Sequence, residues 1–557
     1  MKRWGVAAAL AACFAFRLAF GLSRDFFFED ETQIFLLGFR YYATHAWPFF
    51  GPDVVWTRSE IPGALQALLV GIPLQILPIP EAPFVLLNLM SFAAICTLAW
   101  YVCQQLPTVP RWLVWGWFLT IPWTLQFSAH IINTSYILAP AIVFFIGFFE
   151  SIPTLSLRRL PRWAAFAVMG LAVTWLVQIH MSWPLLLPFA AGAWFGERHA
   201  GARALAVDAI AFAGGALIPG LFLLPTLARY GLHAGSGGVL RNLDPHWVSP
   251  WIVATTLARL LSFGSLEISR FIATDGAKRI EFFSRHLWLA PLAIVIWLAG
   301  TIQPIWMLVD GCRPMRQWPQ ALPPLKWATL RRLIAGSVLL VYTSYWFVME
   351  PPQAHAFYVL APLALTFTAF WWTFVDSPRA RRIAAVVLGL NVALHAGLAW
   401  TEAPELSLYK NREVVATAVR LKMPEMFAHR RDFAVDGGPR ALSDTTRSYD
   451  PSRDFRLLET AYRLGPRGSL HWTITVQNTN RSVAFRDPLY ITTYLNDRGE
   501  AVEERHERLK DIFEPGDTRT IDLSDGFAGP AFTTARMRIA AAEALLPVPA
   551  RSAPAAQ

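Results

Sequence analysis

Residues 4–32 read WGVAAALAACFAFRLAFGLSRDFFFEDET, an apolar segment followed closely by three adjacent carboxylates. The apolar part, Trp4 to Leu22, is roughly 19 residues long, which suffices to cross a bilayer core of about 30 Å. Lys2 and Arg3 precede it, so the positive-inside rule predicts a cytoplasmic N-terminus. The carboxylates are therefore expected at the extracytoplasmic face, where buried charge is costly and usually functional. They are Glu29, Asp30 and Glu31.

Composition extends this interpretation to most of the chain. Of the 557 residues 54% are hydrophobic and only 16% are charged, and apolar runs recur as far as about Trp400. This is typical of a polytopic membrane protein. The formal net charge is +10, but the basic residues gather in short loops between apolar runs, which indicates cytoplasmic loops. No soluble basic face with interleaved aromatic residues occurs, so nucleic acid is not expected as a partner.

The apolar runs predict about 11 transmembrane crossings, an odd number that places the region after Trp400 outside. After the first helix, the expected spans run from Ala82 to Cys103, Trp112 to Phe127, Asn133 to Phe149, Trp163 to Ile179, Ser182 to Phe195, Leu205 to Leu227, His286 to Leu308, Leu333 to Met349, Phe357 to Val375 and Ala384 to Trp400. The segment from Ala64 to Ile79 is bounded and interrupted by prolines, and a full crossing would invert every later loop. It is interpreted as re-entrant or interfacial.

Beyond Trp400 the character of the sequence changes. Period-two alternation in His471 to Gln477 and in Tyr490 to Tyr494 predicts strands. Asn496 to Gly499 and Pro515-Gly516 predict turns between such strands. The expected fold class is an α-helical polytopic membrane protein with a C-terminal all-β sandwich. The expected domains are a membrane domain over 1–401 with an extracytoplasmic loop over 23–63, a linker over 402–430, an extracytoplasmic β-sandwich over 431–547 and a disordered tail over 548–557.

The loop after the first helix carries an apolar periodicity as well as the acidic cluster. One face of the predicted helix holds its apolar residues: Ile34, Phe35, Leu37, Tyr41 and Tyr42. Such a face predicts a helix lying along the membrane surface. Asp30 and Glu31 would lie at its N-terminal end, where the helix dipole favours carboxylates. The pair is either a simple helix cap or includes a general base held at the lipid interface.

The order of these features resembles a known superfamily. A first transmembrane helix, an acidic pair just past it, a surface helix, a proline-bearing return to the bilayer and a many-helix body are similar to the GT-C integral-membrane glycosyltransferases. Within that superfamily, protein O-mannosyltransferases and bacterial aminoarabinose transferases are the most similar groups. The resemblance covers Met1 to about Trp400. It implies a sugar donor carried on a polyprenyl phosphate, an active site facing away from the cytoplasm, and Asp30 as the base that acts on the acceptor. Because Glu29 precedes Asp30, the working pair is either Glu29-Asp30 or Asp30-Glu31.

Transfer from a lipid phosphate also needs cationic or hydrogen-bonding groups for the departing phosphate. Arg58, in Trp56-Thr-Arg-Ser-Glu60, is the first candidate, and its alternative role is that of an interfacial arginine paired with Glu60. The resemblance assigns His355 and Tyr358 to donor binding, against an alternative as interfacial anchors.

Four further polar residues are weaker candidates for the same site. Three of them lie at predicted outer ends of helices: His130, Asn133 and His180. A histidine at a helix junction is, alternatively, a satisfied structural residue. Arg40 is the fourth, and a solvated face of the surface helix would accommodate it equally well.

Cofactor and partner expectations follow from the same residues. The four cysteines match neither a disulfide framework nor zinc spacing, so no cofactor is expected; a divalent metal is compatible with the sequence but not indicated by it. The expected partners are a polyprenyl-phosphate-linked sugar, a glycan, lipid or protein acceptor, and the lipid bilayer. The expected location is the inner (plasma) membrane, with a cytoplasmic N-terminus and a periplasmic C-terminal domain.

Two other functions compete with glycosyl transfer. A transporter or flippase of lipid-linked or polar substrates would carry charges near the middle of its spans and show repeated halves. Arg17 is the main charge within a predicted span, and no internal repeat is evident. Alternatively the membrane part only displays the β-domain, which would leave Asp30 and Glu31 without a task.

Overall fold

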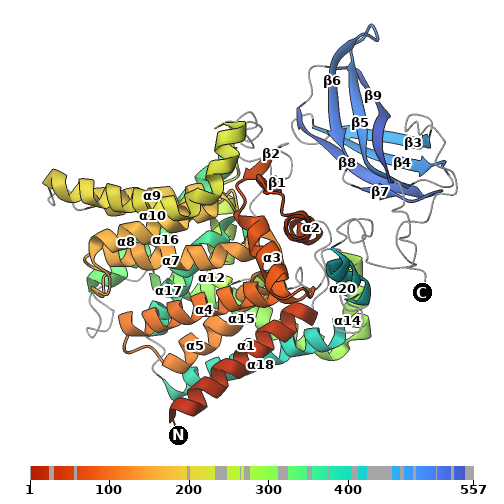
Figure 1. Ribbon diagram of the computed structural model, residues 1–557. Helices are drawn as coiled ribbons and strands as arrows, with labels where there is room; N and C mark the ends of the chain where they lie inside the picture. The colour runs from red at the N-terminus through yellow and green to blue at the C-terminus, as the bar shows by residue number, and fades with distance from the viewer. Residues whose placement is uncertain are drawn as a thin grey trace, which may run out of the picture. The chain divides into compact units, whose positions relative to one another are not determined.

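The computed structural model describes residues 2–23, 30–54, 59–196, 201–231, 247–263, 265–268, 272, 276–311, 324–347, 354–373, 377–402, 412–422, 454–464, 469–480, 484–509, 511–528 and 532–545 (Figure 1). The chain divides into two compact units. The first consists of Met1–Asp53 and Ser59–Lys422, and the second of Val54–Arg58 and Met423–Gln557. The division at Lys422 falls inside the linker predicted over 402–430.

Within the described residues, seven helical segments are long and apolar enough to cross a membrane. They are Trp4–Ser23, Ala82–Gln105, Asn133–Ser151, Gly201–Tyr230, Leu287–Val309, His355–Trp372 and Pro378–Thr401. Four shorter apolar helical segments accompany them: Leu65–Ile76, Arg162–Val177, Trp183–Phe195 and Trp251–Ser262. The predicted fold class, a multi-helix apolar body followed by a β-domain, is therefore confirmed, whereas the predicted number of crossings is not.

The first unit is built from α-helices, short 3-10 helices and one two-stranded hairpin. Its α-helices are α1 (Lys2–Ser23), α2 (Asp30–Thr44), α3 (Leu65–Ile76), α4 (Ala82–Gln105), α5 (Arg111–Thr120), α6 (Pro122–Ala129), α7 (Leu138–Ser151), α8 (Arg162–Val177), α9 (Leu187–Phe195), α10 (Gly201–Tyr230), α12 (Trp251–Ser262), α14 (Gly276–Arg285), α15 (Ala290–Gly311), α16 (Pro324–Ser344), α17 (Ala361–Trp372), α18 (Pro378–Glu402) and α20 (Arg412–Leu421). The 3-10 helices are η1 (Asn133–Ile137), η2 (Trp183–Leu186), η4 (Ser265–Glu267), η5 (Leu287–Leu289), η7 (Tyr345–Phe347) and η8 (Ala354–Leu360). The hairpin pairs β1 (Phe50–Val54) with β2 (Ser59–Pro62).

The predicted single span from Trp112 to Phe127 is wrong, because the segment breaks into α5 and α6. Pro122 disfavours helical backbone in the residue before it, and Ile121 is accordingly extended with ψ 145°. The last carbonyl groups of α5 consequently lack helical partners. Arg17 of α1 donates from Nη1 to the Leu119 carbonyl oxygen, and Asn391 of α18 donates to the Thr120 carbonyl oxygen at 2.6 Å. Distant helices therefore satisfy the end of α5.

Small residues bring two helices of the body unusually close. α8 and α10 pack side by side (Figure 1). A Cβ added to Gly170 would lie 1.9 Å from the Phe212 carbonyl oxygen, and one on Gly215 would lie 1.8 Å from that of Ala167. Such backbone approach is the packing mode that membrane helices favour. α17 differs from α10 in being buried on all sides, as its uniformly apolar sequence predicts.

α2 confirms the predicted helix after the acidic cluster but corrects the expected role of its apolar face. Ile34, Phe35 and Phe39 are fully buried, and Gly38 lies directly against Val70 of α3. The face therefore packs on protein. α3 is 12 residues long, about 18 Å at 1.5 Å per residue, which is too short for a bilayer crossing.

The second unit contains a β-sandwich, as the alternating sequence predicts. One sheet has the order β3 (Phe455–Leu464), β4 (Ser469–Asn478), β8 (Thr518–Ala528); in the other, β5 (Ala484–Leu495) pairs with β6 (Ala501–Arg508), β7 (Ile512–Phe513) and β9 (Thr534–Leu545). Alternate residues of β4 enter a core with those of β5: Leu470, Trp472, Ile474 and Val476 meet Phe485 and Tyr494. Gly499 and Gly516 adopt positive φ in the predicted turns.

Candidate functional site

A buried carboxylate in the first turn of α2 is the centre of the candidate site. Glu31 is 0% exposed, and its Oε1 accepts a hydrogen bond from the backbone N–H of Ile131 at 2.7 Å. Its Oε2 lies 3.5 Å from Nδ1 of His130, a side chain that is 2% exposed. A buried carboxylate requires partners of this kind, because an uncompensated charge away from water is costly. The contact joins Glu31, from the predicted acidic pair, to His130, a weaker candidate that lies far from it in the chain.

The helix that carries Glu31 is held in place along its length by α3. His45 contacts Gln75 at 3.4 Å near the C-terminal ends of the two helices, and Gly38 lies against Ala67 and Val70 farther back. These contacts mean that α2 and α3 run parallel, so their N-termini lie at the same end. Helix N-termini carry partial positive charge, which favours anionic groups such as Glu31 there.

Three short 3-10 helices meet at the same region of the fold. η1 follows His130, η2 follows His180, and η8 contains His355; η8 packs against both η1 and η2. The segments that carry the candidates His130, His180 and His355 are therefore brought together. Burial, followed by the charge of His355, lowers the pKa of His180 to about 3. His180 is consequently neutral at physiological pH.

The two residues assigned to donor binding differ in their surroundings. His355 is exposed, whereas Tyr358, one turn later, is fully buried. The Tyr358 ring lies 4.9 Å from that of Trp123 and 5.3 Å from that of Phe127, both on α6. Tyr358 thus belongs to an aromatic cluster inside the fold, and only His355 of the two presents an accessible side chain.

The remaining weak candidates have local roles in the structure. Nδ1 of His180 lies 2.9 Å from the Ser182 hydroxyl and accepts the Ser182 backbone N–H at 3.1 Å, which closes the turn before η2. Oδ1 of Asn133 accepts the backbone N–H of Thr134 at 2.7 Å. Arg40 is exposed on α2, as a solvated face predicts. These contacts are the structural alternatives that the sequence left open.

Several predicted residues lie outside what the structure describes. Glu29 and Arg58 are not among the described residues, and Asp30 is described as the first residue of α2 without its side chain. Among the described residues no group of three or more histidine, cysteine or acidic side chains could hold a metal ion. The roles given to these residues therefore stay predictions.

Two buried residues near the site were not selected from the sequence as site residues. Arg17, 1% exposed within α1, donates from Nη2 to the Thr124 carbonyl oxygen at 2.8 Å, in addition to its bond with Leu119. Tyr136 of η1 is 1% exposed. A charge within an apolar span is unusual, and this feature could have marked Arg17 in the sequence. No sequence feature could have marked Tyr136, because an aromatic residue in an apolar run is ordinary.

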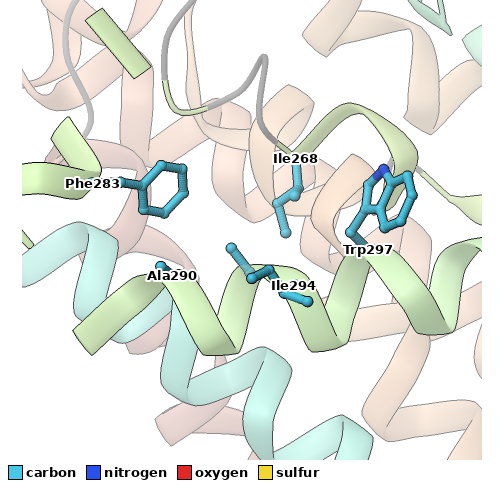
Figure 2. A pocket seen from close by; sticks show the side chains of 6 residues that line it. Ile268, Phe283, Ala290, Ile294 and Trp297 are labelled. Carbon is cyan, nitrogen blue, oxygen red and sulfur yellow. The ribbon is translucent and has the colours of Figure 1, made fainter. Parts of the chain in front are cut away.

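An apolar groove opens beside α15 (Figure 2). It has a volume of about 410 Å³ and is lined by Ile268, Phe283, Ala290, Ala293, Ile294 and Trp297. Figure 2 shows Phe283 and Trp297 flanking the isoleucine side chains along this helix. Ile268 and Ala293 also belong to a core cluster with Leu125 of α6, the helix that leads to His130.

Comparisons with known proteins show a structural likeness at low sequence identity. No protein-family model and no curated protein matches the sequence. Among solved structures, 98% of this chain aligns with arabinosyltransferase EmbB from Mycobacterium smegmatis, at 11% sequence identity and a TM-score of 0.38. The chain spans 65% of the length of that protein. A likeness at this level assigns no residue and no substrate to this chain.

Proposed function

We propose that this protein is a membrane glycosyltransferase that moves a sugar from a lipid-phosphate donor to an acceptor at the extracytoplasmic face. In this reaction an acceptor hydroxyl or amine attacks the anomeric carbon, the bond to the lipid phosphate breaks, and a base takes the acceptor proton. Asp30 is the proposed base. The departing phosphate carries away the bonding electrons and needs hydrogen-bond donors or cations near it.

The observation that carries the proposal is the buried Glu31 with its two partners, in the turn that begins with Asp30. A carboxylate withdrawn from water at the start of a helix fixes the position of its neighbours. The assembled η1, η2 and η8 segments supply polar side chains from three further parts of the chain. Acidic and basic groups gathered where helices end, rather than within them, suit chemistry at the membrane surface.

The groove along α15 supports a lipid-borne donor. Its lining is apolar, so it can accept a hydrocarbon chain without leaving a buried polar group unsatisfied. The groove shares its supporting cluster with α6, and α6 leads directly to His130. A lipid tail held there would keep the attached phosphate and sugar at the membrane surface.

Transport is the less favoured alternative, because the hydrogen bonds of Arg17 give this charge a structural explanation. A transporter uses ionisable residues within its spans to bind or relay cargo. Arg17 instead hydrogen-bonds the carbonyl groups at the break between α5 and α6. Arg17, the main charge within a predicted span, therefore has a structural role.

The deciding experiment is sugar transfer or hydrolysis by the purified, bilayer-reconstituted protein, with a polyprenyl-phosphate hexose and a polyprenyl-phosphate pentose as donors. Asp30→Asn should lower the rate by about 10² or more, the order expected for loss of a general base, without changing the amount of folded protein. Glu29→Gln distinguishes the alternative acidic pair.

A matched control is Asp25→Asn, which removes the nearest carboxylate upstream of the cluster Glu29 to Glu31. This variant should leave the rate within about threefold of the wild type. Wild-type protein that processes neither donor would refute the proposal. Full activity in both Asp30→Asn and Glu29→Gln would refute the acidic mechanism while leaving the donor class intact.

A further inference from the structure

The contact between Glu31 and the residues after α6 has a consequence for the first turn of α2. This turn begins with Asp30, and it follows residues that the structure does not describe. Glu31 accepts the Ile131 backbone N–H at 2.7 Å and lies 3.5 Å from Nδ1 of His130, so one side chain joins the turn to the connection between α6 and η1.

The environment of this contact makes it strong. Glu31 is 0% exposed, His130 2% and Tyr136 1%, so water does not compete for the carboxylate. A hydrogen bond from a backbone N–H to a carboxylate shielded from water is stronger than the same bond exposed to water. The far end of α2 is joined to α3 by an exposed contact between His45 and Gln75 instead. The two ends of the helix are therefore held by attachments of very different strength.

We propose that Glu31 and His130 are positioning residues, which clamp the first turn of α2 to the α6–η1 connection and so hold Asp30 in its working position. The inference rests on the proposed function for the meaning of that position, but the clamp itself is a structural statement that can be tested without a substrate. In this role Glu31 accepts hydrogen bonds, and the His130 ring contacts Glu31 through Nδ1. His130 transfers no proton to or from the sugar.

Hydrogen exchange of the amides of residues 34–37, which donate to the first-turn carbonyl groups of α2, tests the clamp when read by mass spectrometry on the full-length protein. His130→Ala and Glu31→Ala, each of which removes one side of the contact, should increase the exchange rate of these amides about tenfold or more. His130→Asn should stay within about threefold of the wild type, because its amide can present a donor where Nδ1 lies. Gln75→Ala, which breaks the contact at the other end of α2, is the control and should leave the first turn protected.

The same variants are assayed with the polyprenyl-phosphate hexose and pentose. His130→Ala should lower kcat by about 10² with little change in KM for the donor, because small misplacement of a reacting group costs about that much. His130→Asn should restore most of kcat. If His130→Asn is as inactive as His130→Ala while the first turn stays protected, the imidazole acts chemically and the positioning role is overturned.

The remaining outcomes also decide the matter. Unchanged exchange in both His130→Ala and Glu31→Ala refutes the clamp. If Glu31→Ala does not fold, the comparison between His130→Ala and His130→Asn decides alone. Wild-type protein that processes neither donor refutes the proposed function, and the exchange measurement then still shows whether the clamp exists.

Discussion

At the scale of single residues, burial controls which titratable groups carry charge near the candidate site. His180 is half-buried and faces His355, and together these effects lower its pKa to about 3. A neutral His180 can accept the Ser182 N–H at Nδ1, as it does in the turn before η2. Protonation would remove that acceptor, so the turn and the neutral ring support each other.

This shift predicts a pH dependence of stability. The pKa of His180 is about 3 in the folded protein against 6.5 in the unfolded chain, so between these values the unfolded state binds the additional proton. The stability contribution is complete above pH 6.5 and is lost progressively as the pH falls toward 3. His180→Asn keeps an acceptor for Ser182 but does not titrate. Its Tm should therefore fall less than that of the wild type between pH 7 and pH 5. Parallel Tm curves for the two proteins would contradict the assignment.

At the scale of elements, the break between α5 and α6 shows how distant helices complete one another. The Leu119 and Thr120 carbonyl groups end α5, and the Thr124 carbonyl belongs to α6. Arg17 and Asn391, from α1 and α18, bond these groups. A cation at a helix C-terminus is favoured by the helix dipole as well as by its hydrogen bonds. α6 in turn carries the Trp123 ring that packs on Tyr358.

Removing the Arg17 side chain should therefore destabilise the helical body. Arg17→Met leaves buried carbonyl groups without donors and should cost on the order of 3 kcal/mol, seen as a lower Tm in detergent. Arg17→Lys keeps the charge but lacks the forked donor geometry of the guanidinium group. Its Tm should lie between the Tm of Arg17→Met and that of the wild type. Cys13→Ala, one turn earlier on the same helix, is the control and should have a much smaller effect. A wild-type Tm for Arg17→Met would show that the capping bonds contribute nothing.

At the scale of the whole molecule, the two units have separate cores. The β-sandwich buries its own aromatic residues, among them Phe455, Trp472 and Phe513, and its described strands pair with one another. Glu31, His130 and the residues that line the apolar groove all belong to the helical unit. Each unit is therefore expected to fold and to act as an independent part.

Truncation after Lys422 tests this independence. The remaining helical unit should retain basal transfer or hydrolysis of the lipid-linked sugar, since the proposed site lies within it. Residues 423–557 expressed alone should show a β-type circular dichroism spectrum and one cooperative unfolding transition. We expect the truncated protein to lose efficiency on its natural acceptor. Complete loss of basal activity in a folded, membrane-inserted truncation would indicate that the sandwich contributes to the catalytic site.

The sequence by itself determined the class of this protein, because the signals involved are local. Apolar runs long enough for a bilayer crossing marked the helices, and alternation over His471 to Gln477 marked a strand. Gly499 and Gly516 marked turns that need positive φ. The same local reasoning found the acidic cluster and the polar residues at helix ends. It did not distinguish a functional role of these polar residues from a structural one.

Only the tertiary structure decided which polar groups meet. Glu31 and Ile131 are 100 positions apart, and Arg17 and Leu119 are 102 apart. Periodicity specifies the face of an element on which a side chain lies, but not the element that this face will meet. The helix α2 illustrates the difference: Ile34, Phe35 and Tyr42 of its predicted apolar face are buried, but the face packs on protein and not on the membrane surface. The pairing of polar groups is fixed by the requirement that buried charges and carbonyl groups find partners, which is satisfied only when the whole body assembles.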